Sequence, residues 1–221
     1  MSANVAMQFG RITQHAGAKR SSDDGGIIVP SAYQRVEFVG LGNGHVEYNL
    51  NLAPTNHFVF ADIVVVTYGG NSVIFGTASG SRYFHMTEYN NRMYWGRNGT
   101  EANSSTNNTV SVGNGSRYII KYNYGDNYEV IINDISCSSG TEITVTNDNV
   151  LKLGKRDGTY YGLKINFYTF QVTDKSTGKM VRNLIPVYRK SDNAIGFWDA
   201  VNDVFYENVD TGTPIAGDDI N

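Results

Sequence analysis

The sequence predicts an all-β protein in which two antiparallel sheets stack as a jelly-roll sandwich, and three observations support this prediction. Tyr outnumbers Leu fifteen to seven, and Val, Ile, Phe and Thr are plentiful, as expected for half-buried strands. Asn and Gly each occur 24 times, which suits many tight turns. The pattern predicts about a dozen or more strands through residue 206, and no helix of ordinary length is indicated. So many antiparallel strands must close a barrel or stack as two sheets.

The clearest alternation lies in two segments of the chain. Residues 45–52 place Val46, Tyr48, Leu50 and Leu52 on one face. Residues 116–124 place Tyr118, Ile120, Tyr122 and Tyr124 on one face. A period of two over this length predicts half-buried strands. The dipeptides Asn43-Gly44, Asn98-Gly99 and Asn114-Gly115 are typical of hairpin turns.

The first 31 residues differ from the rest of the chain. They are polar, rich in Gly and weakly periodic, and they end in Ser21-Ser22-Asp23-Asp24-Gly25-Gly26 and Pro30-Ser31. We expect an extended N-terminal arm or linker over 1–31 and one sandwich domain over 32–221. The arm is either a disordered terminus or an attachment segment that orders on a partner.

Composition argues against several classes of protein. The net charge of −3 gives no electrostatic footprint for nucleic acid, and no basic run indicates a membrane surface. The single Cys137 excludes an internal disulfide framework. No segment has the length and apolar character of a membrane span, and residues 1–17 lack an apolar core of signal-peptide length. We therefore expect synthesis in a cytoplasm, with retention there or release by lysis or a dedicated machine.

The C-terminal segment "GKMVRNLIPVYRKSDNAIGFWDAVNDVFYENVDTGTPIAG" resembles the closing segment of concanavalin A-like lectin/glucanase sandwiches, also called laminin G-like. The matching pieces are "VRNLIP" with Pro186, a short polar turn, Gly196-Phe197-Trp198-Asp199, and Phe205-Tyr206. "LKLGKRD", residues 151–157, is similar to the family's strand before the last crossing. The resemblance spans residues 33–217, and it assigns structural roles to Pro186, Gly196, Trp198 and Asp199.

Residues 195–208 alternate as strand, turn and strand. Asp199 and Asn202 can hydrogen-bond their own turn backbone. We expect this stretch to close the fold, with its aromatic side chains filling the sandwich. A ligand site at Trp198 is the alternative.

The chain lacks the residues that hydrolysis would need. Glucanases of this fold carry carboxylates at alternate strand positions, because a retaining glycosidase needs two carboxyl groups about 5 Å apart. No such run occurs, and the four His residues are isolated in the sequence, so we expect no catalytic residues and no protein metal site. A bound calcium remains open, with candidate donors in Asp126-Asn127, Asn147-Asp148-Asn149 and Asp157.

The most unusual segment is "SRYFHMTEYNNRMYWGRNG", residues 81–99. Asn90-Asn91 suits a two-residue hairpin turn, which would place Thr87 opposite Tyr94 and Met86 opposite Trp95. One face then carries Phe84, Met86, Met93 and Trp95 and is expected to be core. The other face is polar and aromatic, as sugar-binding surfaces are, and its candidate carbohydrate-binding residues are Tyr83, His85, Tyr89, Arg92 and Tyr94.

A loop supplies a second candidate, Asp157-Gly158-Thr159-Tyr160-Tyr161, from which we select Asp157 and Tyr160. The polar-aromatic face of the 81–99 segment could equally meet a protein, since Tyr and Arg are enriched at interfaces.

The missing run of carboxylates predicts a non-enzymatic protein. The resemblance implies a structural or binding role, because such modules are widespread in phage virion and bacterial surface proteins. We expect a virion protein, made in the host cytoplasm and displayed on the particle, that binds a host surface glycan. Decoration of a capsid or tail without sugar binding is the first alternative, and a glycan hydrolase is the second. The partners would be a glycan or another virion protein held through residues 1–31; a homo-oligomer is open, and neither nucleic acid nor a membrane is expected.

Overall fold

The computed structural model describes most of the sandwich. The described residues are 28–43, 46–53, 56–67, 72–77, 84–89, 92–97, 100–103, 110–124, 128–140, 150–154 and 164–220. They form strands and turns and include no helix, and so none that could cross a bilayer. Residues 1–27 of the expected arm lie outside this range.

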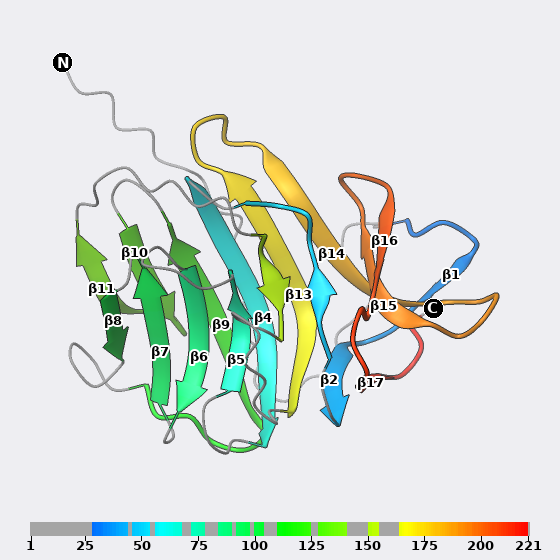
Figure 1. Ribbon diagram of the computed structural model, residues 1–221, viewed down its shortest axis with the longest axis horizontal. Coiled ribbons are helices and arrows are strands. Elements are labelled where there is room, and N and C mark those ends of the chain that lie inside the picture. The colour runs from blue at the N-terminus through cyan, green and yellow to red at the C-terminus, as the bar shows by residue number, and fades with distance from the viewer. Residues whose placement is uncertain are drawn as a thin grey trace.

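The larger sheet contains eleven strands among the described residues, and it forms the back layer in Figure 1. Its main path runs β11-β10-β9-β4-β13-β14-β15-β16, with β1 beside β14 and β2 between β13 and β17. The bounds are β1 Tyr33–Arg35, β2 Val39–Asn43, β4 His57–Thr67, β9 Ser116–Asn123, β10 Tyr128–Ile132, β11 Ile135–Gly140, β13 Lys164–Asp174, β14 Met180–Arg189, β15 Ile195–Asp199, β16 Val204–Glu207 and β17 Thr213–Ala216.

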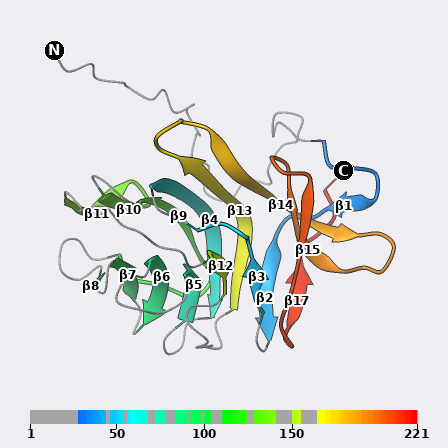
Figure 2. The same ribbon diagram turned by 45° about the horizontal axis from the view of Figure 1, so that its top comes forward.

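The smaller sheet has six described strands in the order β3-β12-β5-β6-β7-β8. Its bounds are β3 Tyr48–Asn49, β5 Ser72–Gly76, β6 Phe84–Tyr89, β7 Arg92–Arg97, β8 Thr100–Asn103 and β12 Lys152–Leu153. Figure 2 shows β5 to β8 as a separate layer from β9, β10 and β11. All pairings among the described strands are antiparallel, which confirms the predicted all-β, two-sheet class.

The main core lies between the two sheets and follows the alternation of the sequence. Tyr118, Ile120, Tyr122 and Tyr124 are all buried, as their period of two predicts. Val46, Tyr48 and Leu50 are buried too, although only Tyr48–Asn49 forms a strand among the described residues 46–52 of the predicted segment. The inward positions of the long central strands β4 and β13 supply the middle of this core.

The two ends of the described sandwich meet at one edge. Val36 forms a bridge with Asp219, and the backbone N–H of Ile220 donates to the Arg35 carbonyl over 2.9 Å. The N–H of Glu37 donates in the same way to the Asp218 carbonyl, also over 2.9 Å. These bonds hold the chain that enters the sandwich against the chain that ends it.

Candidate functional site

The pairing of β6 with β7 has the register that the sequence predicts. Met86 pairs with Trp95, and Thr87 pairs with Tyr94. The last pair before the turn is Tyr89 with Arg92, which leaves the two residues Asn90-Asn91 between the strands. A two-residue loop fixes the register of a hairpin, and this explains why the prediction is confirmed.

Burial identifies which face of this hairpin meets the core. Trp95 and Met93 are fully buried, as predicted for the apolar face. Trp95 belongs to a row of paired residues that crosses the small sheet: Tyr48, Leu153, Phe75, Met86, Trp95 and Ala102. Of this row, Tyr48, Leu153 and Phe75 are also fully buried, so the row faces the larger sheet.

The adjacent row of paired positions therefore belongs to the outer face, because successive strand residues alternate between faces. This row comprises Asn49, Lys152, Gly76, His85, Gly96 and Glu101. His85 lies between a glycine on β5 and a glycine on β7. Glycine within a strand is frequent where another backbone or a ligand approaches closely.

The register also relates the two segments that the sequence singled out. β12 lies two strands from β6, and the chain leaves β12 at Gly154, whose N–H donates to the Ile74 carbonyl over 3.0 Å. Following β5 from Ile74 to Ser72 leads to Glu88 of β6, beside the β6–β7 turn. The loop that contains Asp157 and Tyr160 thus starts from the end of the sheet where Tyr89 and Arg92 lie.

The predicted carbohydrate-binding residues are described to different extents. The backbone of His85, Tyr89, Arg92 and Tyr94 lies in β6 and β7, at the positions given above. Tyr83, Asp157 and Tyr160 lie outside the described residues. Their role in binding therefore stays a prediction.

A buried carboxylate that the sequence does not single out borders the outer row. Glu47 is 4% exposed, and its Oε1 lies 2.7 Å from Nζ of Lys152. The Glu47 backbone N–H donates to Oδ1 of Asn208, and the Glu47 carbonyl accepts from the Val209 N–H, each over 2.9 Å. The alternation of residues 45–52 puts Glu47 on the face opposite Tyr48, and yet its side chain is buried. Its cover comes from a segment 161 positions later, which no local pattern indicates.

Trp198 lies outside the main core, which corrects one expectation. Its neighbour Phe197 fills the space between the sheets, edge-on to Tyr48 at 4.9 Å between ring centroids. Trp198 points to the opposite face and packs in a second cluster with Ile185 and Val187. Alternation along β15 forces this split, so only some of the aromatic side chains of residues 195–208 fill the sandwich.

The second cluster is closed by the end of the N-terminal segment. Tyr33 lies 5.0 Å from Trp198 and 5.3 Å from Phe205 between ring centroids. Val29 packs against the same cluster, and Trp198 is 7% exposed as a result. This position makes Trp198 a packing residue, whereas a sugar platform needs an exposed ring face.

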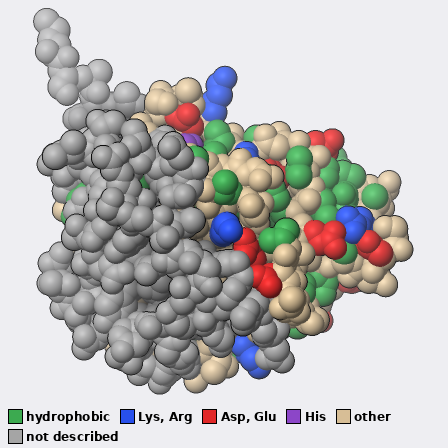
Figure 3. Space-filling model, viewed as in Figure 1, with side chains coloured by type: hydrophobic (Ala, Val, Ile, Leu, Met, Phe, Trp, Pro, Cys, Tyr) green, Lys and Arg blue, Asp and Glu red, His purple; other side chains and the backbone are tan. Residues whose placement is uncertain are grey.

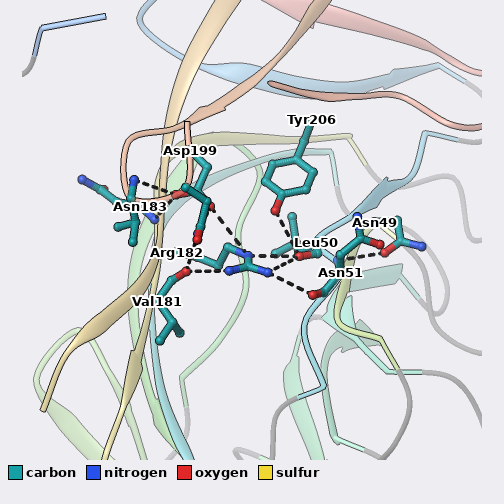
Figure 4. A network of polar contacts seen from close by, with 10 residues as sticks. Asn49, Leu50, Asn51, Val181, Arg182, Asn183, Asp199 and Tyr206 are labelled. Atoms are coloured by element: carbon teal, nitrogen blue, oxygen red, sulfur yellow. Dashed lines mark hydrogen bonds and ion pairs between the residues drawn. The ribbon is translucent and has the colours of Figure 1, made fainter. Parts of the chain in front are cut away.

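Asp199 organises the turn between β15 and β16, as Figure 4 shows in part. Its fully buried carboxylate accepts hydrogen bonds from the backbone N–H of Asn183 and of Val201, each over 3.0 Å, and from Nδ2 of Asn202 over 2.7 Å. Its Oδ2 also lies 3.7 Å from Nε of Arg182. A buried charge requires such partners, so the carboxylate has a structural explanation.

Arg182 connects the larger sheet to the segment that follows β3 (Figure 4). Its guanidinium donates to the Leu50 carbonyl through Nε and Nη2, over 3.0 and 2.9 Å, and to the Asn51 carbonyl over 3.0 Å. The Tyr206 hydroxyl donates to the same Leu50 carbonyl over 3.2 Å. Burial is the main cause that raises the pKa of Tyr206. The network fastens the two sheets together and leaves the Tyr206 phenol protonated.

Pro186 and Gly196 occupy positions that suit their special backbones. Strand β14 pairs with β13 up to Leu184 and with β1 from Val187 onward. Pro186 lies between these two ladders, so its missing N–H falls where the pairing on that side of β14 is interrupted. A Cβ at Gly196 would collide with the carbonyl oxygen of Tyr206 on the neighbouring strand. Gly196 thereby lets β15 and β16 approach closely.

Among the described residues, no three His, Cys, Asp or Glu side chains form a group that could hold a metal ion. The candidate calcium donors of Asp126-Asn127, Asn147-Asp148-Asn149 and Asp157 all lie outside the described residues. Charges are interspersed on the described part of the face in Figure 3, with acidic and basic side chains close together.

Comparison with known proteins finds similarity in structure alone. No protein-family model matches the chain, and no curated protein matches it in sequence. A solved structure of a "putative carbohydrate binding protein" from Bacteroides ovatus matches with a TM-score of 0.55 and 12% identity, over 85% of this chain and 62% of that protein.

Two further structures are similar to a lesser degree. Domains LG4-5 of the mouse laminin alpha1 chain match with a TM-score of 0.49 and 11% identity, over 92% of this chain and 51% of theirs. A single-residue variant of human galectin-16 matches with a TM-score of 0.39 and 13% identity, over 60% of this chain and 99% of its own. The chain thus spans less than two thirds of the Bacteroides protein and about half of the laminin segment.

The fold assignment rests on the two stacked antiparallel sheets and on the Bacteroides similarity. At 12% identity this similarity concerns the fold, and a shared fold does not by itself transmit a function. The chain has the concanavalin A-like, laminin G-like jelly-roll fold that its C-terminal segment predicts.

Proposed function

We propose that this chain binds carbohydrate on the outer face of the six-stranded sheet, beside the β6–β7 turn. The observation that carries the proposal is the register of β6 and β7. Burial of Met93 and Trp95 assigns one side of the hairpin to the core, and the polar and aromatic positions His85 and Tyr94 alternate with that side. Aromatic rings that stack on sugars and polar groups that bind hydroxyls are the usual components of such a site.

Two glycines flank His85 in the outer row: Gly76, which is buried, and Gly96. With glycine on both strands that flank His85, neither Gly76 nor Gly96 places a side chain beside it in that row. The loop that leaves β12 at Gly154 would add Asp157 and Tyr160 at the same end of the sheet, and Arg92 and Tyr89 would complete the turn side. The fold supports this reading, since the Bacteroides protein that shares it is described as carbohydrate binding.

The proposed function is binding without hydrolysis. Glu47, Asp62 and Asp199 are the buried carboxylates among the described residues, and each lies within ion-pair distance of Lys152, Arg117 or Arg182. A buried carboxylate beside a cation is the arrangement of a structural ion pair, whereas a retaining glycosidase needs two carboxyl groups about 5 Å apart. These carboxylates are therefore better explained by folding than by catalysis.

We further propose that the glycan belongs to a host cell surface and that the chain is displayed on a phage virion. The support is the sequence resemblance to modules that are widespread in phage virion and bacterial surface proteins. Decoration of a capsid or tail is the alternative role. Mass spectrometry of purified phage particles tests the proposed location on the virion. Peptides of this chain in the particles support that location, and their absence contradicts it.

A glycan array with the purified full chain, with and without added calcium, tests carbohydrate binding. We expect specific signals for a related set of glycans. Signals that need calcium would add a cation to the site, and an array without signals from a folded protein would contradict the proposal.

A further inference from the structure

The outer face of the eleven-stranded sheet carries two phenyl rings with polar neighbours on both sides. Phe58 and Phe60 are half-buried on β4, whereas Val59 and Ala61 between and after them are fully buried in the core. Both rings therefore belong to the face that points away from the smaller sheet. Residues i and i+2 of a strand lie about 7 Å apart, so the positions of the two rings are about 7 Å apart along β4.

The register places a hydrogen-bonding side chain beside each ring on both adjacent strands. Phe58 pairs with Asn123 of β9 and with Thr173 of β13. Phe60 pairs with Lys121 of β9 and with Gln171 of β13. Adjacent strands lie about 4.8 Å apart, so these polar groups are within reach of whatever lies on the rings.

Two of these polar groups have hydrogen-bonding capacity left over. Asn123 is half-buried, and no hydrogen bond of its side-chain amide is found among the described residues. Gln171 donates to Oδ1 of Asn183 over 3.1 Å, which leaves its own carbonyl oxygen to accept a bond. A planar amide with unused donors and acceptors next to an aromatic ring suits a ligand that combines apolar faces with hydroxyl groups.

Two ion pairs lie on this face, and Glu129, the register partner of Asn123, adds a carboxylate beside them. Nζ of Lys121 lies 2.8 Å from Oδ1 of Asp134. Asp62, the next outward position on β4, accepts two hydrogen bonds from Arg117, over 2.7 and 2.6 Å. The Arg117 guanidinium lies 4.7 Å from the centre of the Tyr168 ring. Asp62, Arg117 and Tyr168 together mark one end of the surface around Phe58 and Phe60. A ligand on this face meets no uncompensated charge from these pairs.

We infer that the outer face of β9, β4 and β13, centred on Phe60, is a second carbohydrate site that binds a neutral, linear polysaccharide. This inference rests on the proposed carbohydrate-binding function and assigns it a further surface and a ligand class. A protein partner fits the face less well, because the core of a protein interface is a contiguous apolar patch, whereas each ring here is flanked by polar side chains. The two ion pairs and the Glu129 carboxylate favour a neutral glycan over an acidic one.

Affinity electrophoresis of the full chain in gels containing single polysaccharides tests this site. The neutral panel is β-glucan, xylan and galactomannan, and the acidic panel is polygalacturonate and hyaluronan. Phe60→Leu keeps an apolar side chain of similar volume and removes the planar ring, and Asn123→Ala removes the amide. We expect at least one neutral polysaccharide to retard the wild type, and each variant to weaken that binding about fivefold or more.

The variant Tyr94→Ala separates this site from the proposed one. We expect it to keep its retardation by the neutral polysaccharide. If Tyr94→Ala loses retardation while Phe60→Leu and Asn123→Ala keep it, the second site is refuted and the proposed function stands. Retardation by acidic polysaccharides alone also refutes it. A wild type that no polysaccharide retards refutes it as well, and the glycan array then decides separately whether the proposed function survives.

Discussion

Tyr33 and Trp198 pack against each other on the outside of the larger sheet, with 5.0 Å between their ring centroids. The contact ties the start of the sandwich to its last hairpin, since Tyr33 belongs to β1 and Trp198 to β15. Trp198 is nearly fully buried by this arrangement.

The replacement Trp198→Ala is expected to destabilise the fold by about 3–5 kcal/mol, because it opens a cavity the size of an indole in the second cluster. Urea unfolding followed by circular dichroism measures the change. A variant with wild-type stability that has lost glycan binding would show instead that Trp198 is a ligand platform.

Asp199→Asn tests the buried carboxylate. The amide oxygen can still accept from the backbone N–H groups of Asn183 and Val201, which both meet Oδ1. The new NH2 group must then face the Nδ2 donor of Asn202, and Arg182 loses its carboxylate neighbour. We expect a loss of about 1–3 kcal/mol in the free energy of unfolding.

Asp203→Asn in the same hairpin is the matched control. Asp203 is exposed and has a φ of +58°, a conformation that Asn adopts easily. We expect a change within about 0.5 kcal/mol. Equal effects of the two replacements would contradict a special role for the Asp199 network.

Gly196→Ala tests the close approach of β15 and β16. The new methyl group would collide with the Tyr206 carbonyl oxygen and lie 2.8 Å from Cζ of Phe205. A backbone atom cannot move aside without disturbing the strand pair, so we expect a loss of about 2 kcal/mol or more.

Gly113→Ala serves as its control, because the nearest atom is the Ser116 hydroxyl oxygen at 2.9 Å, which can rotate away. A change of less than about 1 kcal/mol is expected there, measured by the same urea titration. The explanation would be wrong if Gly196→Ala were the milder of the two.

His57 gives the fold a dependence on pH. Its pKa is lowered from 6.5, mainly because burial disfavours the imidazolium; Arg182 and Lys175 act in the same direction, and Asp174 opposes them. The unfolded chain therefore takes up a proton near the ordinary pKa of histidine, about 6.5, while the folded chain stays neutral. The contribution of His57 to stability is present above that pH and falls as the pH drops below it.

We expect His57→Gln to lose less stability than the wild type on going from about pH 7.5 to about pH 5.5, measured as the difference in the urea midpoint. Comparing the two proteins cancels the carboxylates that titrate in both. An identical decline in wild type and variant would show that His57 does not carry this dependence.

The sequence predicted the local part of the candidate site and missed what depends on distant segments. The β6–β7 register follows from the two-residue Asn90-Asn91 turn and the alternation on each side of it, so it was predictable. The position of Trp198 was not, because the residues that cover it come from the N-terminal segment. The burial of Glu47 depends in the same way on Asn208 and Val209.

The outer face of β4 shows a further reason why the sequence alone could not predict the candidate binding surfaces. Phe58 and Phe60 look like core residues in the sequence, and alternation assigns them to a face without saying which neighbours share it. Only the pairing of β4 with β9 and β13 places Asn123 and Gln171 beside them. Strand order in a sandwich is set by long-range contacts, which local periodicity does not contain.

Isothermal titration of the best array glycan into the wild type and Tyr94→Ala tests the central claim most directly. Tyr128→Ala on β10, in the other sheet, is the matched Tyr-to-Ala control. We predict that Tyr94→Ala binds with a Kd about tenfold weaker or more, the size expected for one stacked aromatic ring, while its free energy of unfolding is unchanged. The control variant is expected to keep the wild-type Kd. Wild-type affinity in Tyr94→Ala would contradict a glycan site on the outer face of the six-stranded sheet.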